Sequence, residues 1–150
     1  MGSPDWETPR HLFYYWNAMY EFTVDAAASD SNHLLPKYRT KETDGLRQDW
    51  TGERVFFNPP YSQSVLGKWV AKAAKREAEV AFGLLPSNTG PKWFHKYILF
   101  QEGVELEFLP GRIAFGDPED SDRRTPRYDN IIVVWHKEPV PFSLVKKHAV

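Results

Sequence analysis

The chain of 150 residues contains no cysteine. This absence excludes disulfide scaffolds, thiolate zinc sites and cysteine nucleophiles, and it fits a protein of a reducing cytoplasm. No apolar run approaches the roughly 20 residues that a membrane-spanning helix requires. The first ten residues also lack the apolar segment of a secretory signal. We therefore expect a soluble, cytoplasmic protein with no membrane partner.

Several catalytic signatures are also missing. The sequence has no G-x-G-x-x-G fingerprint, no Walker-type loop and no G-x-S-x-G motif, which disfavours dinucleotide enzymes, nucleoside-triphosphate hydrolases and serine hydrolases. The five histidines match no compact metal motif, so no metal is expected. The net charge of -1 provides no global attraction to nucleic acid, so any such binding requires a local basic patch.

What the sequence does contain is a large share of aromatic residues. Aromatics make up 15% of the chain, with six tryptophans, while the hydrophobic content of 41% is typical of a globular protein. Aromatic rings first of all fill cores, but they also stack flat ligands. The length predicts one domain over residues 1–150.

The order of predicted elements indicates an α/β fold with a mixed sheet and helices on its faces. A Thr8 cap with Pro9 in the first turn predicts a helix whose buried face contains Leu12, Phe13, Trp16, Met19 and Tyr20. A loop over residues 29–48 separates the first two strands. The other expected elements are strands over 22–25, 54–57, 80–85, 104–108 (half-exposed) and 131–135, helices beginning after residue 61 and over 92–100, and a charged loop over 116–130.

Two polar residues, Asp25 and Asn58, stand where predicted strands end. In α/β sheets, ligands collect at the carboxyl ends of the strands. The segment Asn58-Pro59-Pro60-Tyr61 suggests a mechanism for an aromatic amine, whose delocalised lone pair makes it a poor nucleophile. The Asn58 amide oxygen and the Pro59 carbonyl could accept hydrogen bonds from its two N–H groups and so aim the lone pair at an electrophile. Tyr61 could stack on the aromatic ring. The structural alternative is a proline-rich turn.

Three other segments are weaker candidates, each with a structural alternative. Small residues follow Asp25, so a ligand could approach the backbone there, but plain packing explains the pattern too. Asp49 and Trp50 could meet an adenine, although Trp50 is equally suited to the core. The segment around Thr8 could be no more than a helix cap.

Basic residues gather in the second half of the chain. We interpret Arg123, Arg124 and Arg127, together with Lys92 and Arg112, as candidates for contact with nucleic acid. Acidic residues in the same region bring its net charge close to zero, so a solvated loop is the alternative.

Taken together, the motifs resemble the phage-type DNA N6-adenine methyltransferases, a Dam-like family. The resemblance rests on blocks in the expected order: W-E-T-P (6–9), F-T-V-D-A-A-A-S (22–29), D-G-L-x-x-D-W (44–50), V-F-F-N-P-P-Y (55–61), L-L-P-S-N-T (84–89), W-F (93–94) and G-R-I-A-F (111–115). They cover most of the chain.

The resemblance implies a single compact Rossmann-like domain that uses S-adenosylmethionine to methylate an adenine flipped out of DNA. By this likeness, the residues that hold the cofactor are Trp6, Thr8, Pro9, Asp25, Ala26, Ala27, Asp49, Trp50 and Asn58. Asn58, Pro59, Pro60 and Tyr61 resemble the catalytic loop. With no room for a separate target-recognition domain, the loop over 116–130 is expected to contact DNA together with Lys92, Trp93 and Arg112. A glycine-rich loop is missing, so no residue is assigned to the ribose. A phage or prophage enzyme would act in the bacterial host cell.

Two rival interpretations remain at this level. A methyltransferase with the same loop could act on RNA bases or on a protein glutamine, because the chemistry at Asn58 serves each of these equally. A non-catalytic nucleic-acid-binding protein could also have kept the fold.

Overall fold

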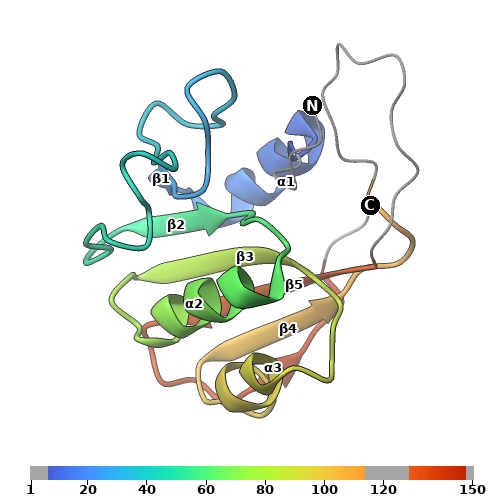
Figure 1. Ribbon diagram of the computed structural model, residues 1–150. Coiled ribbons are helices and arrows are strands. Elements are labelled where there is room, and N and C mark those ends of the chain that lie inside the picture. The colour runs from blue at the N-terminus through green and yellow to red at the C-terminus, as the bar shows by residue number, and fades with distance from the viewer. Residues whose placement is uncertain (1–6, 114–128, 148–150) are drawn as a thin grey trace.

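The computed structural model describes residues 7–113 and 129–147 (Figure 1). In chain order the elements are α1 (Arg10–Tyr20), β1 (Val24–Asp25), β2 (Arg54–Phe57), α2 (Gln63–Ala74), β3 (Val80–Pro86), α3 (Lys92–Tyr97), β4 (Val104–Phe108), β5 (Asn130–His136) and β6 (Ser143–Leu144). Within these residues one sheet forms, with strand order β1-β2-β3-β5-β4-β6.

The strand directions bring five strand ends to one edge of the sheet. β1, β2 and β3 are parallel, so their carboxyl ends meet there. β5 runs antiparallel to β3 with Asn130 opposite Pro86, which places the start of β5 at the same edge. β4 is antiparallel to β5 with Phe108 opposite Ile131, so β4 ends there too. We call this side the carboxyl edge.

Helices cover both faces of the sheet (Figure 1). Alternation along β2 explains why: Val55 and Phe57 face the cluster that contains α2 and α3, whereas Phe56 faces the cluster that contains α1. The α1 cluster contains six buried aromatic residues, with Phe13 and Phe56 edge-to-face at 5.1 Å between ring centroids. The predicted fold class, a mixed α/β sheet with helices on its faces, is confirmed.

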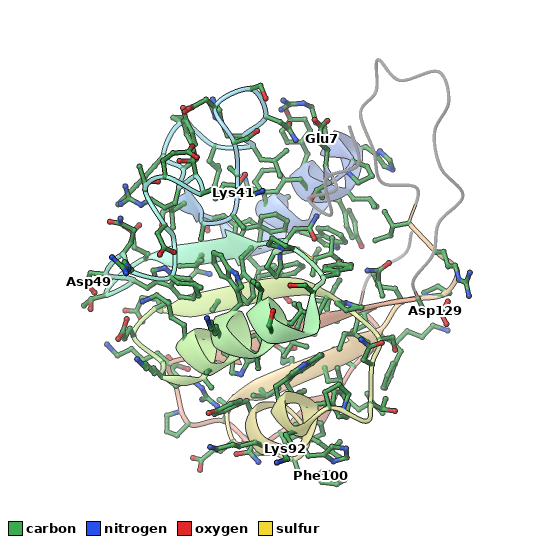
Figure 2. The ribbon with its side chains drawn as sticks, viewed as in Figure 1. Glu7, Lys41, Asp49, Lys92, Phe100 and Asp129 are labelled. Carbon is green, nitrogen blue, oxygen red and sulfur yellow. The ribbon has the colours of Figure 1, made fainter. Side chains whose placement is uncertain are left out.

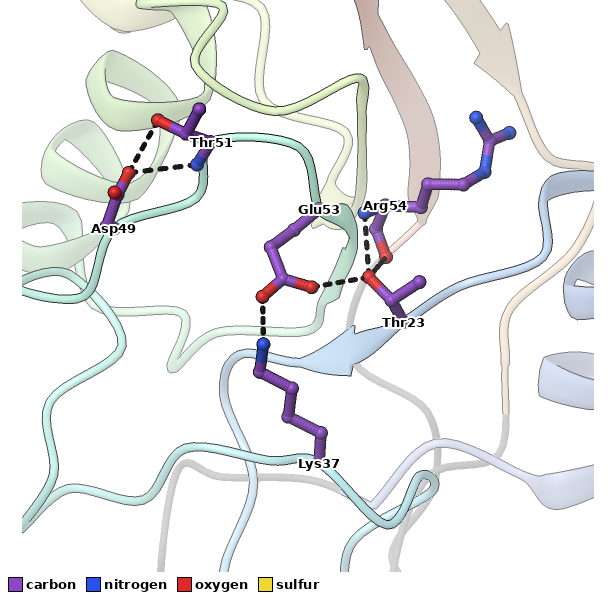
Figure 3. Close-up of polar contacts among 6 residues, drawn as sticks. All are labelled: Thr23, Lys37, Asp49, Thr51, Glu53 and Arg54. Atoms are coloured by element: carbon purple, nitrogen blue, oxygen red, sulfur yellow. Dashed lines mark hydrogen bonds and ion pairs between the residues drawn. The ribbon is translucent and has the colours of Figure 1, made fainter.

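The loop after β1 is attached to the sheet by polar contacts (Figure 3). The Thr23 hydroxyl donates to Glu53 Oε1 at 2.7 Å and accepts the Arg54 N–H at 2.8 Å. Lys37 forms an ion pair with the same Glu53 carboxylate, and its backbone carbonyl accepts the N–H of Asp25 at 3.1 Å. The loop is therefore held beside β1, with its side-chain contacts at the amino end of β1 and β2.

Three local predictions are wrong. Pro9, not Thr8, is the N-cap residue of α1, and no side chain caps that helix; the Pro9 carbonyl accepts the first helical N–H bonds. Met19 was expected on the buried face but is 43% exposed, because the buried stripe of α1 runs through Trp16 and Tyr20 and Met19 lies at its margin. Glu107 was expected on the exposed side of β4 but is 1% exposed.

No helix in the described ranges is long and apolar enough to cross a bilayer.

Candidate active site

The loop of residues 58–61 leaves β2 at the carboxyl edge. Pro59 is buried, whereas Asn58, Pro60 and Tyr61 are partly exposed. The Asn58 side-chain N–H donates to the Thr8 hydroxyl at 2.9 Å, across 50 residues of sequence. Thr8 itself is buried, just before α1. This bond turns the amide nitrogen of Asn58 toward Thr8 and its carbonyl oxygen away from Thr8.

Tyr61, at the other end of the loop, is held through its hydroxyl. That hydroxyl donates to the Leu84 carbonyl at 3.1 Å and accepts an N–H from Asn130, also at 3.1 Å. Its ring packs against the α2-side core while remaining partly exposed. Sequence reasoning missed Asn130; the available signal was a polar residue directly before the buried run Ile131–Trp135.

Asp25 ends β1 and is 3% exposed. Its carboxylate accepts the Leu34 N–H at 3.1 Å and a backbone N–H from Ala27. Burial raises its pKa to about 6, against the opposing effects of these two hydrogen bonds and of nearby His33. In the described part of the chain, no lysine or arginine forms an ion pair with it. Among the described residues, this buried acid therefore has backbone donors and the nearby His33 but no ion pair with a lysine or arginine.

Replacing Asp25 with asparagine is expected to stabilise the protein without ligand at pH 7 by about 2 kcal/mol. A carboxyl group whose pKa is raised by folding stabilises the fold below its ordinary pKa of 3.8, and this stability is lost as pH rises through about 6. Urea unfolding across that range should show the fall in the wild type and not in Asp25→Asn. An identical pH dependence in both proteins would contradict the assignment.

Asp49 and Trp50 lie away from the Asn58 loop. Asp49 is exposed beyond the amino end of β2, on the opposite side of the view from Asp129 (Figure 2). Its carboxylate accepts two bonds from Thr51, and these lower its pKa. Trp50 is 2% exposed, donates its indole N–H to the Gly45 carbonyl at 3.1 Å and packs against Phe57. Trp50 thus occupies the core, and the cofactor contact of this segment stays a prediction.

The residues predicted to contact DNA differ in exposure and in their partners. Lys92 is exposed at the start of α3, but the neighbouring Trp93 is 6% exposed and belongs to the core. Arg112 forms an ion pair with Asp129, 3.0 Å between Nε and Oδ1, beside the start of β5. Trp6, Arg123, Arg124 and Arg127 lie outside the described residues.

Comparison with known proteins adds the family. Residues 3–150 match the model of the family described as DNA N-6-adenine-methyltransferase (Dam). A DNA N-6-adenine-methyltransferase of Escherichia phage T1 is 32% identical over 92 residues, which is 59% of this chain and 38% of the relative. One of Haemophilus phage HP1 is 24% identical over 147 residues, covering 94% of this chain and 83% of the relative.

The chain thus spans less than half the length of the T1 relative and most of the length of the HP1 relative. The compact α/β architecture is consistent with a Rossmann-like methyltransferase fold. Because the family match covers nearly the whole sequence, the chain belongs to the DNA N-6-adenine-methyltransferase (Dam) family.

Proposed function

We propose that the protein transfers a methyl group from S-adenosylmethionine to the exocyclic N6 amine of an adenine in DNA. Membership of the Dam family and the activity printed in the names of two phage relatives support this proposal. The structural observation that carries it is the Asn58 amide, oriented by Thr8 at the carboxyl edge of the sheet.

The loop acts on the amine by accepting hydrogen bonds from its two N–H groups. With its nitrogen committed to Thr8, the Asn58 amide presents its carbonyl oxygen as an acceptor for one N–H of the amine. The Pro59 carbonyl accepts the other, and these two bonds draw the nitrogen lone pair out of conjugation with the ring. Two prolines stiffen the loop, so the acceptors are in place before the base arrives. Transfer would form the N6–methyl bond as the methyl–sulfur bond breaks, with S-adenosylhomocysteine as the leaving group, and the methylated amine would then lose its extra proton to solvent. Neither acceptor therefore has to titrate.

The chemistry of Asp25 fits the cofactor. S-adenosylmethionine supplies an electrophilic methyl group on a cationic sulfur, and it also carries an ammonium group and ribose hydroxyls. A buried carboxylate with a raised pKa and no cationic side chain paired with it is suited to such donors. Thr8 and Pro9, joined to the catalytic loop through the Asn58 bond, are proposed to border the same ligand. Ala26 and Ala27, the small residues that follow Asp25, are proposed to let the ligand approach the backbone.

The target base has to leave the duplex to reach this loop. Flipping costs a few kcal/mol, and stacking on the partly exposed Tyr61 ring would offset part of this cost. Exposed Lys92 and Arg112, together with Arg123, Arg124 and Arg127, are proposed to contact the phosphate backbone. Trp93 would need to leave the core to stack on a base.

The test is a transfer assay with tritiated S-adenosylmethionine and three acceptors: plasmid DNA from a host that lacks adenine methylation, total RNA and total protein. We expect label in DNA, recovered as N6-methyl-2′-deoxyadenosine after digestion to nucleosides. Label confined to RNA or protein would reject adenine in DNA as the target. No transfer and no heat of cofactor binding by calorimetry would instead indicate a binding protein that kept the fold.

A further inference from the structure

We propose that Asn130 is a positioning residue that holds the Tyr61 ring for the incoming base. This inference rests on the proposed function for its catalytic consequence. Asn130 is the first residue of β5 and is 1% exposed. Its side-chain nitrogen donates both to the Tyr61 hydroxyl and to the Leu85 carbonyl, each at 3.1 Å.

The surroundings of Asn130 determine which way its amide faces. The nitrogen lies beside two oxygen atoms, the Tyr61 hydroxyl and the Leu85 carbonyl, and it has one hydrogen for each. Turning the amide over would set its oxygen against the Leu85 carbonyl and lose that bond. Its own oxygen is buried and has no hydrogen-bond partner. The amide thus keeps both donations and leaves its own buried oxygen unsatisfied, which is a destabilising arrangement.

These bonds complete a clamp on the catalytic loop. Thr8 holds the first residue of the loop through the Asn58 amide, and Asn130 with Leu84 holds the last through the Tyr61 hydroxyl. The Tyr61 ring therefore cannot turn about its bond to the backbone without breaking bonds to two strands. A ring that is fixed in advance binds a base without the entropic cost of ordering it. Asn130 would act on the base through Tyr61 and not by touching it.

A double-mutant cycle of Asn130→Ala and Tyr61→Phe tests this role. Tyr61→Phe keeps the stacking ring but removes the hydroxyl that Asn130 holds. We expect each single substitution to lower kcat/KM for unmethylated plasmid DNA about fivefold to tenfold, with the KM for S-adenosylmethionine unchanged. In the Tyr61→Phe protein, Asn130→Ala should lower kcat/KM by less than about a further twofold, because the bond through which Asn130 holds the Tyr61 ring is already gone.

Asn17→Ala is the matched control. It removes a side-chain hydrogen bond of an asparagine remote from the loop, in which Asn17 Oδ1 accepts the Phe22 N–H at 2.7 Å, at the far end of α1. It should lower stability without changing kcat/KM and should show no coupling to Tyr61→Phe. If Asn130→Ala fails to fold, Asn130→Ser, whose side chain is too short to span the same distance, completes the cycle.

An equal loss from Asn130→Ala in both backgrounds would overturn the proposal, since a purely structural residue acts independently of the Tyr61 hydroxyl. Urea unfolding of the same four proteins reads the coupling without any substrate. If the wild type transfers no methyl group to DNA, the proposed function fails. The coupling of Asn130 to Tyr61 is then tested by the unfolding cycle alone, in which additive losses of stability would refute it.

Discussion

Replacing Asn58 with alanine is expected to lower turnover at least a hundredfold while leaving S-adenosylmethionine affinity nearly unchanged. The substitution removes a preorganised acceptor from the amine, and losing one such polar group typically costs about 10²–10³ in kcat. It also removes the donor to the buried Thr8 hydroxyl but no apolar core atoms. Single-turnover transfer to plasmid DNA and calorimetry with S-adenosylmethionine measure the two quantities.

The control for Asn58→Ala is again Asn17→Ala, which loses a hydrogen bond remote from the loop. Normal turnover in the Asn58 variant would show that its amide does not orient the amine. A parallel loss of cofactor affinity and turnover would show that Asn58 binds the cofactor in place of activating the base.

Strands with a clear local pattern could be predicted closely from the sequence. The bounds of β2 and β4 match the predicted residues 54–57 and 104–108. In β2 the reason is local, since Asn58-Pro59-Pro60 ends an apolar run and proline donates no ladder bond. The helix over 92–100 was predicted too long, and the two-residue β6 was not predicted at all. A strand that short has no detectable periodicity and depends on pairing with β4.

Residue burial was predicted less well where tertiary packing decides it. Alternation places Glu105 and Glu107 on the same face of β4. Glu105 is partly exposed and Glu107 is buried, and this difference depends on the tertiary structure around that face. Trp50 could not be assigned from the sequence, because an indole suits either a ligand or a core. Its position depends on Phe57 and Trp69, which come from two other elements.

In the candidate site, too, local sequence predicted the positions of single residues but not their tertiary contacts. Asp25 and Asn58 were correctly placed at strand ends, because a strand and the polar residue that follows it are adjacent in sequence. The Thr8–Asn58 and Asn130–Tyr61 bonds join residues 50 and 69 positions apart. No local pattern encodes such pairs, so the two ends of the clamp become visible only when the sheet is assembled.

The second substitution expected to have a large effect is at Gly45. We expect Gly45→Ala to lower the free energy of unfolding by about 3 kcal/mol and to abolish cofactor binding. A β-carbon at this position would overlap the backbone carbonyl oxygen of Ala26 and come within 2.9 Å of Trp69 Cη2. The Ala26 carbonyl cannot move without cost, because the N–H of the same residue donates to the Phe56 carbonyl in β2 at 2.9 Å. Relief requires moving the segment that follows Asp25.

Gly67→Ala separates this steric effect from the general consequences of replacing a glycine. Gly67 lies inside α2, and its added β-carbon would meet only Trp93 Cδ1 at an ordinary 3.7 Å. Alanine there should stabilise the protein by about 1 kcal/mol, because glycine is the poorer helix former. Thermal unfolding and calorimetry with S-adenosylmethionine compare the two variants. If Gly45→Ala were as stable as the wild type and bound the cofactor normally, the close packing of Gly45 on Ala26 would have no part in shaping the site.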